Sequence, residues 1–150
     1  MSTESLLIGD LFVAEGVDTL SLVQVTDTHL TGTEMGCFLG MNTARSARTV
    51  IDAALASESA DYILVTGDIA ADGQPEAYGQ LEVLLGTSLP SLWLPGNHDD
   101  VSSYKNRYAP HMKRRLRAKH WDVVMLETQV EGEVGGVLST TELAALRSAV

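Results

Sequence analysis

The sequence has little that would support an extracellular or membrane-bound protein. It contains a single cysteine, Cys37, so no disulfide can form within the chain, and a reducing compartment is expected. No apolar run approaches the length needed to span a bilayer, and the N-terminus lacks the basic region and apolar stretch of a secretory signal. These absences predict a cytoplasmic protein with no membrane partner.

Basic residues are also scarce. The chain has 10 Lys and Arg against 20 Asp and Glu, which gives a formal net charge of −10. Because phosphate backbones favour basic protein faces, this balance argues against a DNA or RNA polymer as partner. A small phosphate ester remains compatible, since bound metal ions can reverse the local charge. At 150 residues and 45% hydrophobic, the chain is expected to form a single domain over residues 1–150.

Apolar segments alternate with segments of helical periodicity along the chain. The expected strands span residues 20–25, 62–65, 92–94 and 123–126. The expected helices span residues 43–57, a segment that opens at Pro75, and residues 101–118, where Pro110 interrupts the pattern. This alternation predicts an α/β fold with a largely parallel sheet.

The last segment begins with a capping box, in which Ser139 and Glu142 occupy the N-cap and N3 positions. Leu143, Leu146 and Val150 then recur at helical spacing, and no glycine cap follows them. The pattern is that of a helix cut short. We therefore expect these residues to be the front part of a longer domain.

Three of the expected strands run into clusters of polar residues. The first is followed by Asp27-Thr28-His29, the second by Gly67-Asp68, and the third by Gly96-Asn97-His98-Asp99. In open parallel sheets, ligands bind beyond the carboxyl ends of the strands. Each cluster alone is also explained as a turn or a cap, because Asp, Asn and Gly are turn formers. Their recurrence at three strand ends predicts one shared site.

Four of these residues are suitable metal ligands. Asp27 and His29 point to the same side in extended chain, so they could hold one divalent ion together. The two carboxylate oxygens of Asp68 could bridge two ions, and the Asn97 carbonyl oxygen is a hard, neutral ligand.

The remaining two residues suggest proton transfer. The imidazole of His98 could donate a proton to a leaving oxygen. Asp99 could orient the His98 imidazole as a hydrogen-bond partner behind it. A plain turn accounts for the glycine and asparagine of this loop but not for the histidine.

The motifs DTH, GD and GNHD, in this order at strand ends, resemble those of the calcineurin-like metallophosphoesterases. The stretches QVTDTHL, FLGMNTARS, VTGDIAADGQPEAY, WLPGNHDD and ETQVEGEVGGVLSTTEL are closer still to the class III cyclic nucleotide phosphodiesterases. The resemblance covers roughly residues 20–150. It implies a two-sheet sandwich flanked by helices (αββα), of which this chain supplies the front half. It also implies two divalent metal ions, most often Fe or Mn, with Zn or Co as alternatives.

Carried over residue by residue, the resemblance implies that Asp27 and His29 bind the first ion, that Asp68 bridges both, and that Asn97 binds the second. A hydroxide held between the ions would attack phosphorus, and His98 would protonate the departing 3′-oxygen. The expected reaction is hydrolysis of a 3′,5′-cyclic nucleotide, with cyclic AMP favoured, to the 5′-monophosphate. The partner is thus expected to be a small phosphodiester.

The chain also departs from the family pattern, which needs further histidines, including a later Gly-His-x-His pair. His111 and His120 are the two unassigned histidines, and they flank a basic segment that is better explained as a solvated face than as a ligand site. Residues 1–150 alone are therefore expected to be nearly inactive. The relatives also tend to carry Asp where Glu127 stands and His near Gly135, which leaves the fit of the substrate open.

Two alternatives stay open on these grounds. One is a broader phosphodiesterase or phosphatase of the same superfamily. The other is a non-catalytic fragment that lacks the histidines of the second ion. The metal identity and the oligomeric state, including a homo-oligomer, are not specified by the sequence.

Overall fold

The computed structural model describes residues 10–12, 18–57, 59–100, 102 and 108–149. Its first sheet is parallel and has the strand order β2-β5-β6. The bounds of these strands are β2 Leu22–Val25, β5 Tyr62–Thr66 and β6 Ser91–Leu94. The parallel α/β arrangement expected from the alternation of apolar and helical segments is confirmed.

A second, mixed sheet has the order β1-β7-β8, in which β1 and β7 run parallel and β7 and β8 antiparallel. Its strands are β1 Asp10–Phe12, β7 Arg115–Arg117 and β8 Asp122–Val124. A short hairpin, β3 Cys37–Phe38 and β4 Met41–Asn42, precedes the first helix. The helices are α1 Thr43–Ser57, α2 Pro75–Leu85, the 3-10 turn η1 Ala109–His111 and α4 Thr140–Ala149.

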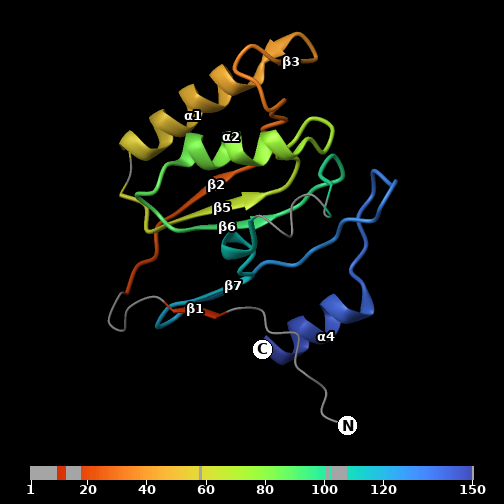
Figure 1. Ribbon diagram of the computed structural model, residues 1–150. Coiled ribbons are helices and arrows are strands. Elements are labelled where there is room, and N and C mark those ends of the chain that lie inside the picture. The colour runs from red at the N-terminus through yellow and green to blue at the C-terminus, as the bar shows by residue number, and fades with distance from the viewer. Residues whose placement is uncertain (1–9, 13–17, 58, 101, 103–107, 150) are drawn as a thin grey trace.

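Helices α1 and α2 lie together on one face of the first sheet (Figure 1). Alternate residues of β5, Ile63 and Val65, face this helical layer and are almost completely buried. Ala47 and Ile51 of α1 pack in the same cluster, because their spacing places them on one side of the helix. This cluster is the main hydrophobic core.

The other face of the first sheet packs on the second sheet. Tyr62 and Leu64, the residues of β5 that alternate with the core pair, join a cluster with Leu92, Leu116 and Met125. Helix α4 lies on the far side of the second sheet from α1 and α2 (Figure 1). The layers are therefore helix, sheet, sheet and helix, in agreement with the two-sheet architecture that the resemblance implied.

One expected helix is wrong in its second part. Residues 101 and 103–107 lie outside the described part of the chain, and the described residues 102 and 108 are helical. From residue 109 on, the segment expected to be helical to residue 118 instead forms η1 and the strand β7. Pro110 cannot donate a backbone hydrogen bond, and it disfavours helical geometry in the residue before it. Leu116 is then fully buried between the sheets, while Arg115 forms a bidentate ion pair with Asp122. Tertiary burial thus overrides the helical pattern.

The capping box of the last helix forms only in part. The Glu142 backbone N–H donates to Ser139 Oγ at 3.1 Å, as expected. The Glu142 carboxylate accepts instead from Arg114 at 2.6 Å and from the Glu127 N–H at 3.1 Å, so α4 is joined to the residue before β7 and to the segment after β8. None of the helices in the described part of the chain has the length and apolar character that crossing a bilayer requires.

Candidate metal centre

The three polar loops meet at the carboxyl ends of β2, β5 and β6. The Asp27 N–H donates to the Gly67 carbonyl at 3.1 Å, and the His29 N–H donates to the Asp68 carbonyl at 2.9 Å. The His98 N–H donates to Asp68 Oδ1 at 3.1 Å. The loop after β5 is therefore the central one. Its backbone carbonyls hold the loop after β2, and its Asp68 carboxylate holds the loop after β6.

The backbone is strained at three of the expected metal ligands. Asp27, His29 and Asp68 have φ angles of 54°, 42° and 48°, and Leu39 is the one other non-glycine residue with positive φ in the described part of the chain. Non-glycine residues in this left-handed region cost free energy, and such residues concentrate at functional sites. The fold thus stabilises a costly conformation at the residues that carry the polar groups.

Two glycines allow the loops to approach each other closely. A Cβ on Gly96 would collide with the side chain and the backbone nitrogen of Asp68. Gly67, at φ 109°, would place a Cβ 3.0 Å from the Gly96 backbone. Only glycine fits at both positions, and this contact brings Asp68 beside Asn97 and His98.

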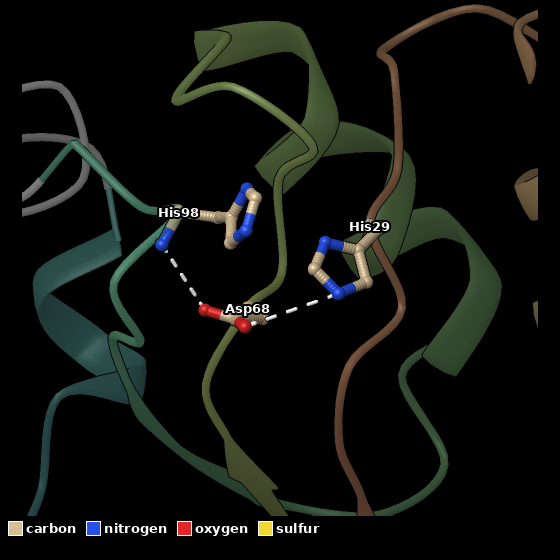
Figure 2. Close-up of side chains that lie close together, drawn as sticks. All are labelled: His29, Asp68 and His98. Atoms are coloured by element: carbon tan, nitrogen blue, oxygen red, sulfur yellow. Dashed lines mark hydrogen bonds and ion pairs between the residues drawn. The ribbon is translucent and has the colours of Figure 1, made fainter. Parts of the chain in front are cut away.

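The side chains of His29, Asp68 and His98 each offer a ligand atom within 4.8 Å of the others. Figure 2 shows the Asp68 carboxylate between the two histidines. His29 Nε2 lies 3.8 Å from Asp68 Oδ2 and 4.0 Å from Asp27 Oδ1. These separations are too long for hydrogen bonds, and they are the kind expected of ligands that share an ion.

The donor set fits a divalent transition metal. Carboxylates and imidazoles together favour ions such as Mn, Fe or Zn over Mg or Ca. His29 is mostly buried, and its Nδ1 has no hydrogen-bond partner among the described residues. The other ring nitrogen, Nε2, faces the carboxylates of Asp27 and Asp68, where a shared metal ion would bind all three groups. The residues present therefore fit the ion that the resemblance implied.

The ring of His98 is held by a backbone group. Its Nδ1 lies 2.8 Å from the Ala71 carbonyl oxygen, which can only accept, so Nδ1 carries a proton and Nε2 is left for chemistry. The ring meets that of His29 edge-on, with centroids 4.8 Å apart. Phe38, from the β3–β4 hairpin, stacks on His29 at 4.7 Å. This aromatic cover was not anticipated from the sequence.

Asp99 has a different role from the one suggested by the sequence. It does not orient the His98 ring, which Ala71 holds; its carboxylate accepts the backbone N–H groups of Ile69, Ala70 and Gly96 at 3.1, 2.9 and 2.8 Å. Burial raises the pKa of this carboxyl group, and the three N–H donors partly offset that effect. Asp99 thus ties the loop that follows β5 to the loop that follows β6.

Asn97 lines a cavity of about 200 Å³ together with Asp27 and Asp68. The opposite wall comes from segment 128–136, which closes on itself through a hydrogen bond from the Val137 N–H to the Thr128 carbonyl at 2.8 Å. The glycines and polar residues of ETQVEGEVGG are typical of a loop, but only the structure shows that this loop lies over the cavity. Glu133 of this segment, an exposed carboxylate, also lines the cavity.

His111 and His120 lie away from this centre. His111 stacks on Trp93 at 4.5 Å and lies 3.1 Å from Ser91 Oγ, at the opposite end of β6 from Asn97. His120 lies 3.6 Å from Asp18. The structure therefore places neither histidine with the expected ligands.

Comparison with known proteins identifies the family. The model of the calcineurin-like phosphoesterase family matches residues 20–142. The chain is similar to the 3′,5′-cyclic adenosine monophosphate phosphodiesterase CpdA of Vibrio vulnificus, with 31% identity over 143 residues, 86% of this chain and 49% of the relative. The protein of the same name from Haemophilus influenzae is 34% identical over 136 residues, 85% of this chain and 49% of the relative.

A 3′,5′-cyclic-nucleotide phosphodiesterase of Nostoc is 33% identical over 135 residues, which cover 86% of this chain and 50% of the relative. The chain thus spans about half the length of these relatives. Because the family match extends over most of the residues and includes all three polar loops, the chain belongs to the calcineurin-like phosphoesterase family.

Proposed function

We propose that the protein takes part in metal-dependent hydrolysis of a 3′,5′-cyclic nucleotide, with cyclic AMP as the favoured substrate, to the 5′-monophosphate. The observation that carries the proposal is the convergence of His29, Asp68 and His98 from three strand ends, with strained backbone at the first two. The names of the relatives support the substrate class. A cytoplasmic location, in keeping with the single cysteine, is part of the proposal.

In this proposal, Asp27 and His29 would hold a first divalent ion, Asp68 would be a ligand shared with a second, and Asn97 would contribute to that second ion. Such ions supply a nucleophile from water at neutral pH and neutralise charge on the phosphoryl group. We favour Fe or Mn, because the donor set combines imidazole with carboxylate. Among the described residues, the second ion would have only Asp68 and Asn97, so residues 1–150 alone should bind it weakly.

His98 is the proposed general acid. Its Nδ1–H is held by the Ala71 carbonyl, so the protonated ring presents Nε2–H to the leaving oxygen. Transfer of that proton to the 3′-oxygen prevents a strongly basic alkoxide from forming as the ester bond breaks. The residue acts on substrate directly, whereas Asp99 holds the loops that carry it and Asp68.

The test is Mn²⁺-dependent turnover of cyclic AMP, bis(p-nitrophenyl) phosphate and p-nitrophenyl phosphate, by the 150-residue chain and by any longer chain that its gene encodes. We expect diester turnover in the longer chain and its loss in Asp68→Ala and His98→Ala. His111→Ala is the matched control, because this histidine lies at the other end of β6. Full activity in His98→Ala would contradict the proposed acid.

The same assay separates the two competing functions. A strong preference for the monoester would favour a broader phosphatase of the superfamily over the cyclic nucleotide reaction. Absence of turnover in every chain that the gene encodes, together with absence of Mn²⁺ binding, would favour a non-catalytic protein.

A further inference from the structure

Tyr78 of α2 contacts the loop that carries Asn97 and His98, although its side chain is completely buried and lies in the helical layer. Its hydroxyl oxygen accepts the Asp100 backbone N–H at 3.0 Å. The same hydroxyl group hydrogen-bonds the Asp99 carboxylate, where the phenol is the donor. The hydroxyl group therefore donates to one residue of this loop and accepts from the next.

We propose that Tyr78 is a positioning residue of the metal centre: its hydroxyl group sets where the Asn97–His98 loop lies relative to Asp68. This inference rests on the proposed function in so far as the centre binds metal. Nothing in the motifs points to Tyr78, because it lies in the apolar stripe of α2 with Ala77 and Leu81.

The cost of burial is the first argument. A hydroxyl group removed from water costs free energy unless it is hydrogen-bonded, and phenylalanine would fill the same apolar space without that cost. The ring already packs in the core, 5.8 Å from the ring of Tyr108. The feature that needs explanation is therefore the oxygen atom, and its described contacts are with Asp99 and Asp100.

The geometry of the loops is the second argument. Asp99 accepts N–H groups from Ile69 and Ala70, the two residues that follow Asp68, and from Gly96. The Tyr78 hydroxyl donates to this same carboxylate. Helix α2 thus holds a carboxylate that joins the two ligand loops through three backbone N–H groups, and outer partners of this kind affect metal affinity when they are removed.

A purely structural role makes a different prediction. If the hydroxyl group only stabilised the core, its removal would lower the free energy of unfolding and leave the metal affinity of the folded protein unchanged. If it positions the ligands, the folded variant should bind metal more weakly. Stability and metal affinity must therefore be measured on the same variants.

The experiment compares Tyr78→Phe with Tyr108→Phe in the 150-residue chain. Tyr108 is the matched control, because it is also buried and its ring stacks on Trp93 at 5.5 Å. Mn²⁺ affinity is measured by isothermal titration calorimetry under conditions where circular dichroism shows both variants folded. We expect the Kd of Tyr78→Phe to rise about 10-fold, at the low end for outer-partner substitutions, and that of Tyr108→Phe to stay within about twofold.

A second measurement needs no metal. Amide hydrogen exchange, followed by NMR, should be faster in Tyr78→Phe at Ile69, Ala70 and Asp100, and unchanged at these positions in Tyr108→Phe. Unchanged exchange in Tyr78→Phe would overturn the inference. So would a Tyr78→Phe variant that binds Mn²⁺ with the same Kd as a wild type that binds the ion. A wild type that binds no Mn²⁺ would count against the proposed metal centre instead, and exchange alone would then decide whether Tyr78 holds the loops.

Discussion

The two sides of the metal centre differ in how firmly the fold supports them. One side carries Asp68, Asn97 and His98 at the ends of β5 and β6, and these strands are covered by α2. Trp93 of β6 and Tyr78 of α2 are almost completely buried there. Asp27 and His29 follow β2, which pairs only with β5 among the described strands. Beside β2, an apolar cavity of about 530 Å³ extends between this strand and α1 as far as Asp27 and His29.

The two sides also differ in how exposed their apolar side chains are to solvent. Leu22 of β2 is 36% exposed and Val50 of α1 is 64% exposed, whereas Leu81 of α2 is completely buried. The β5–α2–β6 side therefore has its ligands held by a close-packed core and by the Asp99 hydrogen bonds. On the β2–α1 side, Asp27 and His29 are held by backbone pairing to Gly67 and Asp68, and the side chains of this pair also contact Thr26 and Phe38 of the exposed hairpin, respectively. Preorganisation of a site requires such supporting contacts, so the two sides should respond differently to substitution.

The largest effect is expected where the loops of the β5–α2–β6 side touch. Gly96→Ala would place a methyl group against the Asp68 side chain and backbone, so the loops must separate. We expect loss of Mn²⁺ binding and destabilisation by about 3 kcal/mol, as for overpacking of a tight interior. Calorimetry measures Mn²⁺ binding, and urea denaturation measures the free energy of unfolding.

Gly135→Ala is the control for this substitution. Gly135 has no atom within 4 Å of an added Cβ, although it lines the same cavity as Asn97. Its stability and Mn²⁺ affinity should remain those of the wild type. If Gly96→Ala behaved like Gly135→Ala, the close approach of the two loops would not be needed for binding.

An effect on stability alone, without loss of metal binding, should distinguish the cores of the two sides. Leu81→Ala removes a fully buried side chain under β5 and should cost about 2–5 kcal/mol. Val50→Ala removes an exposed side chain at the edge of the β2–α1 cavity and should change stability by less than about 0.5 kcal/mol. If urea denaturation showed that both variants lose the same free energy of unfolding, the β2–α1 side would be as closely packed in solution as the other side.

The smallest effect concerns alkaline pH. Burial, followed by the charge of Asp99, raises the pKa of Tyr78 above its ordinary value of 10.0, so the folded phenol stays neutral while the unfolded one ionises. Stability should then fall as the pH rises above the unfolded pKa, by at most about 1.4 kcal/mol per pH unit from this group. Urea denaturation at about pH 9 and about pH 11 measures the loss.

Tyr62, at the start of β5, provides the comparison for this effect. Its pKa is also raised, mainly by burial, but the side chain is only partly buried and its contribution should be smaller. Tyr78→Phe should therefore reduce the alkaline loss of stability more than Tyr62→Phe does. The opposite ranking would contradict the view that the β5–α2–β6 side excludes water.

Much of the fold could be predicted because burial leaves a periodic pattern in the sequence. The apolar runs before Asp27, Asp68 and Asn97 form neighbouring parallel strands. The apolar positions of α1 and α2 pack in the main hydrophobic core. The pattern failed at residues 109–117, where a strand pairing with β1 and β8 replaced the expected helix. Short apolar-basic segments fit either structure, and the pairing partner decides between them.

For the site, the sequence by itself determined which groups are available and that they follow strand ends, because residue type and strand order are local properties. Only the tertiary structure decided what each group contacts. It assigned the His98 ring to Ala71, made Asp99 the link between two loops, and brought Tyr78 to that link from a helix. These contacts join residues about 20 to 30 positions apart, and their geometry depends on how helices and loops pack on the finished sheet.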